Sequence, residues 1–180
     1  MIRFEFEGNV YFITKTGVVD EHYCLLNDAE GLKVACAYYS SVPYHELSED
    51  DLLDYVRQSA KAGAFKNALA AYEYGIKKYS LYSFGKSAMP TIAAGYRRVG
   101  QPEKAIEFAK RCIRDSDLCS VPLLTSMAAA FCDVGDLDNA KKYCNLAYAL
   151  QGGGPGYKNE LSLVYCRIEK LENRGSRGSK

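Results

Sequence analysis

The amino-acid sequence predicts an α+β protein, with a small antiparallel β-segment at residues 1–47 followed by an α-solenoid of helical hairpins at residues 48–172. Two observations carry this prediction. Apolar residues recur with period two up to Leu47 and with a helical period from Ser48 onward. Breaks that contain glycine then separate the helical segments at regular intervals. The last residues, 173–180, have no apolar side chain and are expected to be disordered.

Composition narrows the class of protein. The chain has 180 residues, of which 48% are hydrophobic and 25% charged, as in a globular domain. No apolar run approaches the roughly 18 residues that a membrane span needs, and the N-terminal residues have no signal-peptide core. We therefore expect a cytoplasmic protein without a membrane segment. The seven cysteines include no Cys-x-x-Cys pair and are expected to be reduced thiols, with no metal and no cofactor bound.

Charge is divided unevenly along the chain. Residues 1–50 contain 3 basic and 9 acidic side chains, whereas residues 51–170 contain 17 basic and 12 acidic ones. Such a division indicates either an anionic partner for the basic part or docking of one part on the other. We favour docking of the acidic segment on or near the basic array. Separately made pieces 1–47 and 48–180 would then associate, and added salt would weaken their association.

The β-segment begins with two alternating runs. Apolar residues alternate with charged ones over residues 2–6, and the alternation resumes at Val10. Gly8-Asn9 between the runs predicts a β-hairpin with a type II′ turn. A second pair of strands is predicted at residues 22–26 and 32–39, with a short helix at 32–39 as the alternative. A sheet of three or four strands would need a neighbour to cover its apolar face.

Helical signals begin at Ser48, which precedes three acidic residues that complement the dipole of a following helix. Short and long breaks then alternate, which is typical of helical hairpins. Gly63, Gly100 and Gly135 stand in the short breaks, 37 and then 35 residues apart, and an alanine follows each glycine by five residues. Such a glycine gives the first helix of each pair a left-handed end.

This repeat resembles the tetratricopeptide (TPR) family, whose unit is about 34 residues of helix–turn–helix. The resemblance covers residues 50–151, and residues 157–172 would be a lone capping helix. The positions that match the buried positions of the family are Leu52, Tyr55, Val56, Ser59, Tyr72 and Gly75, then Met89, Ile92, Ala93, Tyr96, Ala109 and Cys112, then Leu124, Met127, Ala128, Phe131, Cys144 and Ala147. The closing proline of the family is missing from all three repeats.

The resemblance implies an adaptor, scaffold or chaperone-like function, because the first helices of TPR pairs line a concave groove that binds peptides or helices. In this sequence the corresponding groove residues are Leu53, Arg57, Ala60, Pro90, Ala94, Arg97, Thr125, Ala129, Cys132, Asn159 and Leu163. The guanidinium groups of Arg57 and Arg97 suit a carboxylate. The expected partner is therefore another protein or a peptide with an acidic or carboxylate terminus. The alternative is that both arginines are merely solvated.

Other functions remain open. A nucleic-acid-binding regulator would use the basic array, but its positive charge is modest, so a nucleic-acid partner is not favoured. A small enzyme would use the N-terminal segment, where a strand would place Asp20, His22 and Cys24 on one face. No catalytic residue and no metal ligand is assigned on that basis. A homodimer, formed through an exposed sheet edge or the capping helix, is also left open.

Overall fold

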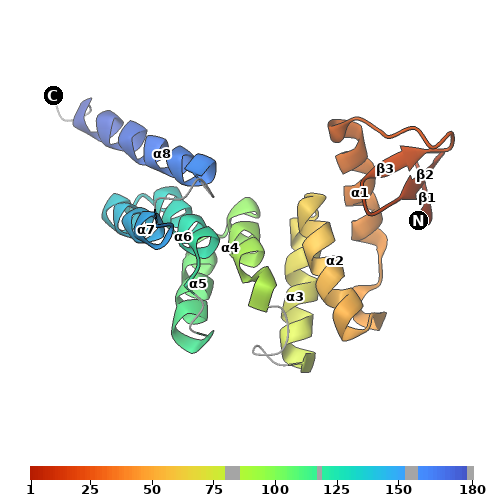
Figure 1. Cartoon of the computed structure of the whole chain (residues 1–180), viewed down its shortest axis with the longest axis horizontal. Helices are drawn as coiled ribbons and strands as arrows, with labels where there is room; N and C mark the ends of the chain where they lie inside the picture. Colours follow the sequence, from red (N-terminus) through yellow and green to blue (C-terminus); the bar gives the residue numbers. More distant parts are fainter. Residues whose placement is uncertain (80–85, 117–118, 153–157, 178–180) are drawn as a thin grey trace. The chain divides into compact units, whose positions relative to one another are not determined.

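The computed structural model describes residues 1–79, 86–116, 119–152 and 158–177 (Figure 1). The chain divides into two compact units, Met1–Gly85 and Lys86–Lys180, and each is described by itself. Within the described residues, a three-stranded antiparallel sheet is followed by eight α-helices and two short 3₁₀ helices. The predicted α+β class, a small sheet followed by an array of helices, is confirmed.

The sheet of the first unit has the strand order β1-β2-β3. Its strands are β1 (Ile2–Phe6), β2 (Asn9–Ile13) and β3 (Val18–Asp20). Phe6 pairs with Asn9, so the hairpin turn is Glu7-Gly8, and both turn residues have positive φ, 50° and 82°. Positive φ at both positions is the pattern of a type I′ turn. The predicted hairpin is present, but its turn lies one residue earlier than Gly8-Asn9 and is not of type II′.

The second predicted pair of strands is wrong, and the alternative, a helix at residues 32–39, is the one present. Residues 32–39 lie in a helix, α1 (Asp28–Ser41), and residues 22–26 form only an isolated bridge, between Leu25 and Val19. The helix begins at Asn27, whose side chain accepts a hydrogen bond from the Glu30 N–H at 3.0 Å. This N-cap and the contact of the helix with the sheet outweigh the β propensity of the residues near Tyr39.

Helix α1 covers the apolar face of the sheet, as Figure 1 shows. Val34 of α1 is buried together with Tyr11, Ile13 and Val18 of the sheet. Phe4 meets the ring of Tyr38 edge-on, with ring centroids 5.4 Å apart. The neighbour that the sheet requires therefore comes from within residues 1–47, in a segment where the sequence predicted strands.

The remaining helical elements of the first unit are η1 (Tyr44–Glu46), α2 (Glu49–Lys61) and α3 (Phe65–Tyr79). Helix α2 begins at the predicted N-cap, where the Ser48 side chain accepts a hydrogen bond from the Asp51 N–H. Aromatic rings then connect the elements: Tyr39 of α1 contacts Tyr55 of α2, and Tyr44 of η1 contacts both Tyr55 and Tyr74 of α3. Several of the tyrosines are thus packing residues.

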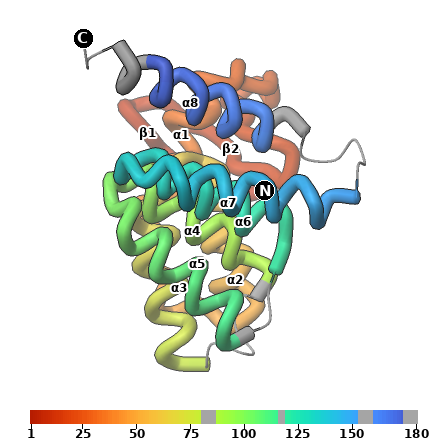
Figure 2. The backbone as a smooth tube through the Cα atoms, turned by 90° about the vertical axis from the view of Figure 1, so that its left-hand side faces the viewer, coloured from red at the N-terminus to blue at the C-terminus, as the bar shows by residue number. Residues whose placement is uncertain are grey.

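The second unit contains η2 (Lys86–Ala88), α4 (Met89–Arg98), α5 (Pro102–Ser116), α6 (Val121–Asp133), α7 (Leu137–Leu150) and α8 (Lys158–Arg177). Helices α4 and α5 form one pair and α6 and α7 the next, and α6 also packs against α4 and α8 (Figure 2). Helix α8 therefore occupies the place of a further first helix. It continues past residue 172 into the segment expected to be disordered, and Glu172 forms an ion pair with Lys141 of α7.

The three short breaks share one geometry. Gly63, Gly100 and Gly135 have φ of +83°, +76° and +81°. The residue after each glycine donates its N–H to a carbonyl five residues earlier, at 2.8–3.0 Å, which is the Schellman motif. All eighteen positions matched above to the buried positions of the TPR family are buried. The predicted left-handed end of each first helix is confirmed.

Replacing Gly63 by alanine is expected to destabilise the first unit by about 1 kcal/mol, because a Cβ raises the energy of the left-handed conformation. The space around Gly63 is open, so the cost is conformational and not steric. Gly31 is the matched control. It lies inside α1, where a Cβ would make ordinary contacts with Leu26 and Val18 at 3.7 and 4.0 Å. Gly31→Ala should leave stability unchanged or raise it. Chemical denaturation of both variants checks this, and equal effects would contradict the assignment of the turn.

Candidate functional site

The predicted groove residues lie in both units. Leu53, Arg57 and Ala60 lie on α2 in the first unit, where Ala60 is buried and the other two are partly exposed. The other residues belong to α4, α6 and α8 of the second unit. Joint action of Arg57 and Arg97 on one ligand stays a prediction.

Within the second unit, the predicted groove residues of α6 are more deeply buried than those of α4 and than Leu163 of α8. Thr125, Ala129 and Cys132 are buried, because α6 packs against both α4 and α8. The Thr125 hydroxyl donates to the Val121 carbonyl at 2.8 Å and is thus satisfied within its own helix. The predicted groove residues of α6 therefore have small side chains and expose little surface.

The flanking helices contribute the accessible side chains. On α4, Pro90, Ala94 and Arg97 are partly exposed. On α8, Leu163 is 70% exposed. The side chain of Asn159 lies outside the described residues.

Asp133 connects α4 and α8 at the end of α6. Its Oδ2 accepts a hydrogen bond from Nε of Arg97 at 2.7 Å, and its Oδ1 accepts one from Nη1 of Arg167 at 2.5 Å. The side chains of Arg97 and Asp133 are 22% and 24% exposed, and that of Arg167 is 42% exposed. We call these three residues the Arg97–Asp133–Arg167 cluster. Arg167 follows Leu163 by four residues, so both lie on the same side of α8.

Sequence reasoning found Arg97 and missed Asp133 and Arg167. The signal was weak: Asp133 stands one residue after the predicted groove position Cys132, and Arg167 one turn after Leu163. Asp133 stands at the position that Lys61 and Arg98 occupy in the first two hairpins, so the repeat predicts no acid there. The contact therefore depends on how α8 is rotated against α6, which the sequence period alone does not specify.

The cluster has more positive than negative charge. Burial raises the pKa of the Asp133 carboxyl, but hydrogen bonds from Arg97 and Arg167 outweigh it and hold this pKa below its ordinary value. Asp133 is therefore ionised at neutral pH, and the three groups together have a charge of about +1. Each guanidinium has five N–H donors, and Asp133 uses one from each. The arrangement can therefore hold a second carboxylate.

Two other basic side chains of the second unit are paired with acids. Arg114 bonds to Asp115 at 2.6 Å, and Lys141 pairs with Glu172. These pairs compensate part of the positive charge that a nucleic-acid backbone would need.

The N-terminal residues considered for an enzyme do not share a strand face. Asp20 ends β3, and its carboxylate accepts hydrogen bonds from the backbone N–H groups of His22 and Cys24, at 2.9 and 2.8 Å. Tyr23 has a positive φ of 61°, so the chain turns where a strand was expected. Among the described residues, no group of three or more His, Cys, Asp or Glu side chains could hold a metal ion.

Three cysteines of the second unit are buried, namely Cys112, Cys132 and Cys144. Burial raises the pKa of the Cys112 thiol to about 11 and that of the Cys144 thiol to about 12. These thiols are protonated at neutral pH and act as small apolar side chains.

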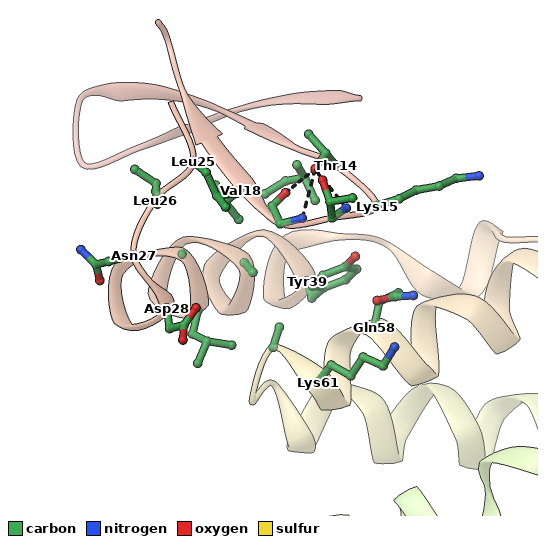
Figure 3. A pocket seen from close by; sticks show the side chains of 17 residues that line it. Thr14, Lys15, Val18, Leu25, Leu26, Asn27, Asp28, Tyr39, Gln58 and Lys61 are labelled. Carbon is green, nitrogen blue, oxygen red and sulfur yellow. Dashed lines mark hydrogen bonds between the residues drawn. The ribbon is translucent and has the colours of Figure 1, made fainter. Parts of the chain in front are cut away.

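The first unit has an open cleft of about 460 Å³ between the turn after β2, α1 and the end of α2 (Figure 3). Its apolar lining includes Val18, Leu25 and Leu32, and the last two are at least half exposed. Lys15 and Lys61 also line it. Sequence reasoning missed this cleft because part of its wall is α1, where a strand at residues 32–39 was favoured over a helix.

Comparison with solved structures finds PcrH from Pseudomonas aeruginosa, at 19% sequence identity and a TM-score of 0.55. The match covers 70% of this chain and 95% of that chain. At this identity the likeness shows the fold alone, and it agrees with the TPR-like hairpin geometry described above. No family model and no curated protein matches the chain. None of the described helices combines the length and the apolar character that crossing a membrane requires.

Proposed function

We propose that this chain is a protein-interaction module, an adaptor or chaperone-like protein of the cytoplasm, that binds a peptide or a protein terminus against α4, α6 and α8. The observation that carries the proposal is the Arg97–Asp133–Arg167 cluster beside the exposed Leu163. A surplus cation next to an apolar side chain suits a ligand with a carboxylate and an apolar residue. The fold supports the proposal, since stacked helical repeats offer extended concave binding surfaces.

In the proposed complex, the ligand carboxylate accepts N–H donors of Arg97 and Arg167 that Asp133 leaves available. Asp133 keeps the two guanidinium groups close together despite their like charge. The ligand lies against the exposed side chains of α4 and α8, because the predicted groove residues of α6 are buried, and Leu163 contacts an apolar ligand side chain. Arg57, in the first unit, would bind a separate acidic part of the same partner.

The test is capture of partners from a lysate of the source cell by the intact protein and by the Arg97→Ala/Arg167→Ala variant. We expect the intact protein to retain a partner that the variant loses, because removing a charged hydrogen-bond partner typically costs about 1.5–3 kcal/mol. The matched control is Arg98→Ala/Lys170→Ala, which removes one exposed cation from each of the same helices. Equal capture by all three proteins would contradict the proposed site.

A third variant examines the cleft of the first unit. Leu25→Ser/Leu32→Ser removes two exposed apolar side chains from its lining. If this variant loses the partner and the Arg97→Ala/Arg167→Ala variant keeps it, the cleft is the binding surface and the proposal for α4, α6 and α8 is wrong.

A further inference from the structure

We propose that two copies of this chain pair through β1, in an antiparallel register centred on Phe4. β1 is an outer strand of the sheet (Figure 1). Among the described residues, no backbone hydrogen bond joins its outer side to another segment. The edge at β3 is different, because the Leu26 N–H donates to the Val18 carbonyl and the Asp20 N–H to the Cys24 carbonyl, both at 3.0 Å. β1 is therefore the edge that can accept another strand.

The hairpin determines which backbone groups of β1 point outward. Phe6 and Asn9 flank a two-residue turn and form a hydrogen-bonded pair. Because such pairs alternate along an antiparallel ladder, Phe4 and Ile2 also direct their backbone groups toward β2. The N–H and C=O groups of Arg3 and Glu5 therefore point away from the sheet and are the groups that a new strand would meet.

The side chains of the same two residues have opposite charges. Nη2 of Arg3 and Oε1 of Glu5 are 2.6 Å apart, and the two side chains are 58% and 64% exposed. Both lie on the face of the sheet opposite α1, since Phe4 points toward α1 and alternate residues point to opposite faces. A second strand at this edge would therefore meet one cation and one anion. In an antiparallel copy of β1 these two charges run in the reverse direction.

Charge then selects the register. Pairing centred on Phe4 places Arg3 opposite Glu5 of the second copy, and Glu5 opposite Arg3 of the second copy. These are also the residues whose backbone groups point outward. Moving the register by two residues places either Arg3 opposite Arg3 or Glu5 opposite Glu5, and like charges directly opposite each other destabilise a strand pair.

The apolar face is consistent with the same register. Ile2 is 48% exposed and would lie opposite Phe6 of the second copy, on the side of the sheet that α1 covers. An edge protected against pairing typically has lysines, a proline or a bulge. β1 has no lysine, no proline and no bulge, and its two exposed charges, Arg3 and Glu5, are complementary in this register. The product is a continuous six-stranded sheet with a two-fold axis at Phe4.

Sedimentation of the full chain and of charge variants tests the proposal. The intact protein is expected to show a monomer–dimer equilibrium. Arg3→Glu and Glu5→Arg should each weaken the dimer about tenfold, because each change makes both symmetry-related pairs repulsive. The double variant Arg3→Glu/Glu5→Arg restores opposite charges and should restore the dimer. Lys15→Glu, a change at an exposed residue outside β1, should have no effect.

Mixing the two single variants gives the sharpest result. The chain with Arg3→Glu presents two anions and the chain with Glu5→Arg two cations, so their mixture should form a heterodimer tighter than either homodimer. A monomeric intact protein at the highest concentration it tolerates would overturn the proposal. A dimer that all four charge variants keep unchanged would also overturn it. Thermal unfolding of each variant excludes loss of fold as the cause.

Discussion

Replacing Met127 by alanine is expected to destabilise the second unit by about 2–5 kcal/mol. Met127 is fully buried in α6, and α6 packs against α4, α5, α7 and α8. A cavity at this point removes contacts that hold several helices together. The expected loss is a large part of the total stability of a typical domain, about 5–15 kcal/mol.

Denaturation followed by circular dichroism measures this effect. Leu163→Ala on α8 is the control, because its side chain is 70% exposed and its removal should change stability by no more than about 0.5 kcal/mol. Equal effects of the two substitutions would mean that α6 is not the centre of the second unit.

Replacing Asp133 by asparagine is expected to strengthen carboxylate binding about tenfold, because the variant loses the negative charge that repels a ligand carboxylate, and a tenfold change corresponds to about 1.4 kcal/mol. The same change should lower stability modestly, since Arg97 and Arg167 then repel each other without a counter-ion. The measurement is titration of one carboxylate peptide against the intact and the variant protein. Unchanged or weaker binding by the variant would contradict repulsion between Asp133 and the ligand carboxylate.

Ionisation of Asp133 makes the stability of the second unit depend on pH in a predictable direction. The native pKa of Asp133 is lowered, so its contribution is present above the unfolded value, about 3.9, and is lost as pH falls through the lower native pKa. At acid pH the intact protein should therefore lose part of its free energy of unfolding that the Asp133→Asn variant does not lose, and denaturation of both proteins at several pH values measures this difference. If the free energies of unfolding of the two proteins fall in parallel below about pH 4, the role of the cluster is contradicted.

The helical hairpins could be predicted from the sequence because their ends are determined locally. Gly63, Gly100 and Gly135 each take a left-handed φ, and the hydrogen bonds that follow involve residues no more than five apart. Helix α1 could not be predicted in the same way. Its residues near Tyr39 favour a strand when considered alone, and their helix is stabilised by a cap at Asn27 and by contact with the sheet.

The candidate site was predictable only in part. Arg97 follows from the repeat, whereas its contact with Asp133 depends on tertiary packing. The phase of α8 differs from that of the other first helices: Val164 and Ile168 are buried and Ser162 is exposed. That rotation brings Arg167 to Asp133. A lone last helix has no second helix of its own to fix its rotation, so the repeat period does not specify it.

The central claim is that a ligand carboxylate binds at Arg97 and Arg167. The most direct measurement is calorimetric titration with pairs of short peptides, selected from a random library, that differ only in a free carboxylate or an amide at the C-terminus. The intact protein is predicted to bind the carboxylate form and to bind the amide form at least about tenfold more weakly, and the Arg97→Ala/Arg167→Ala variant to lose this preference. Equal affinity of the intact protein for both forms, or a preference that persists in the variant, would contradict the claim.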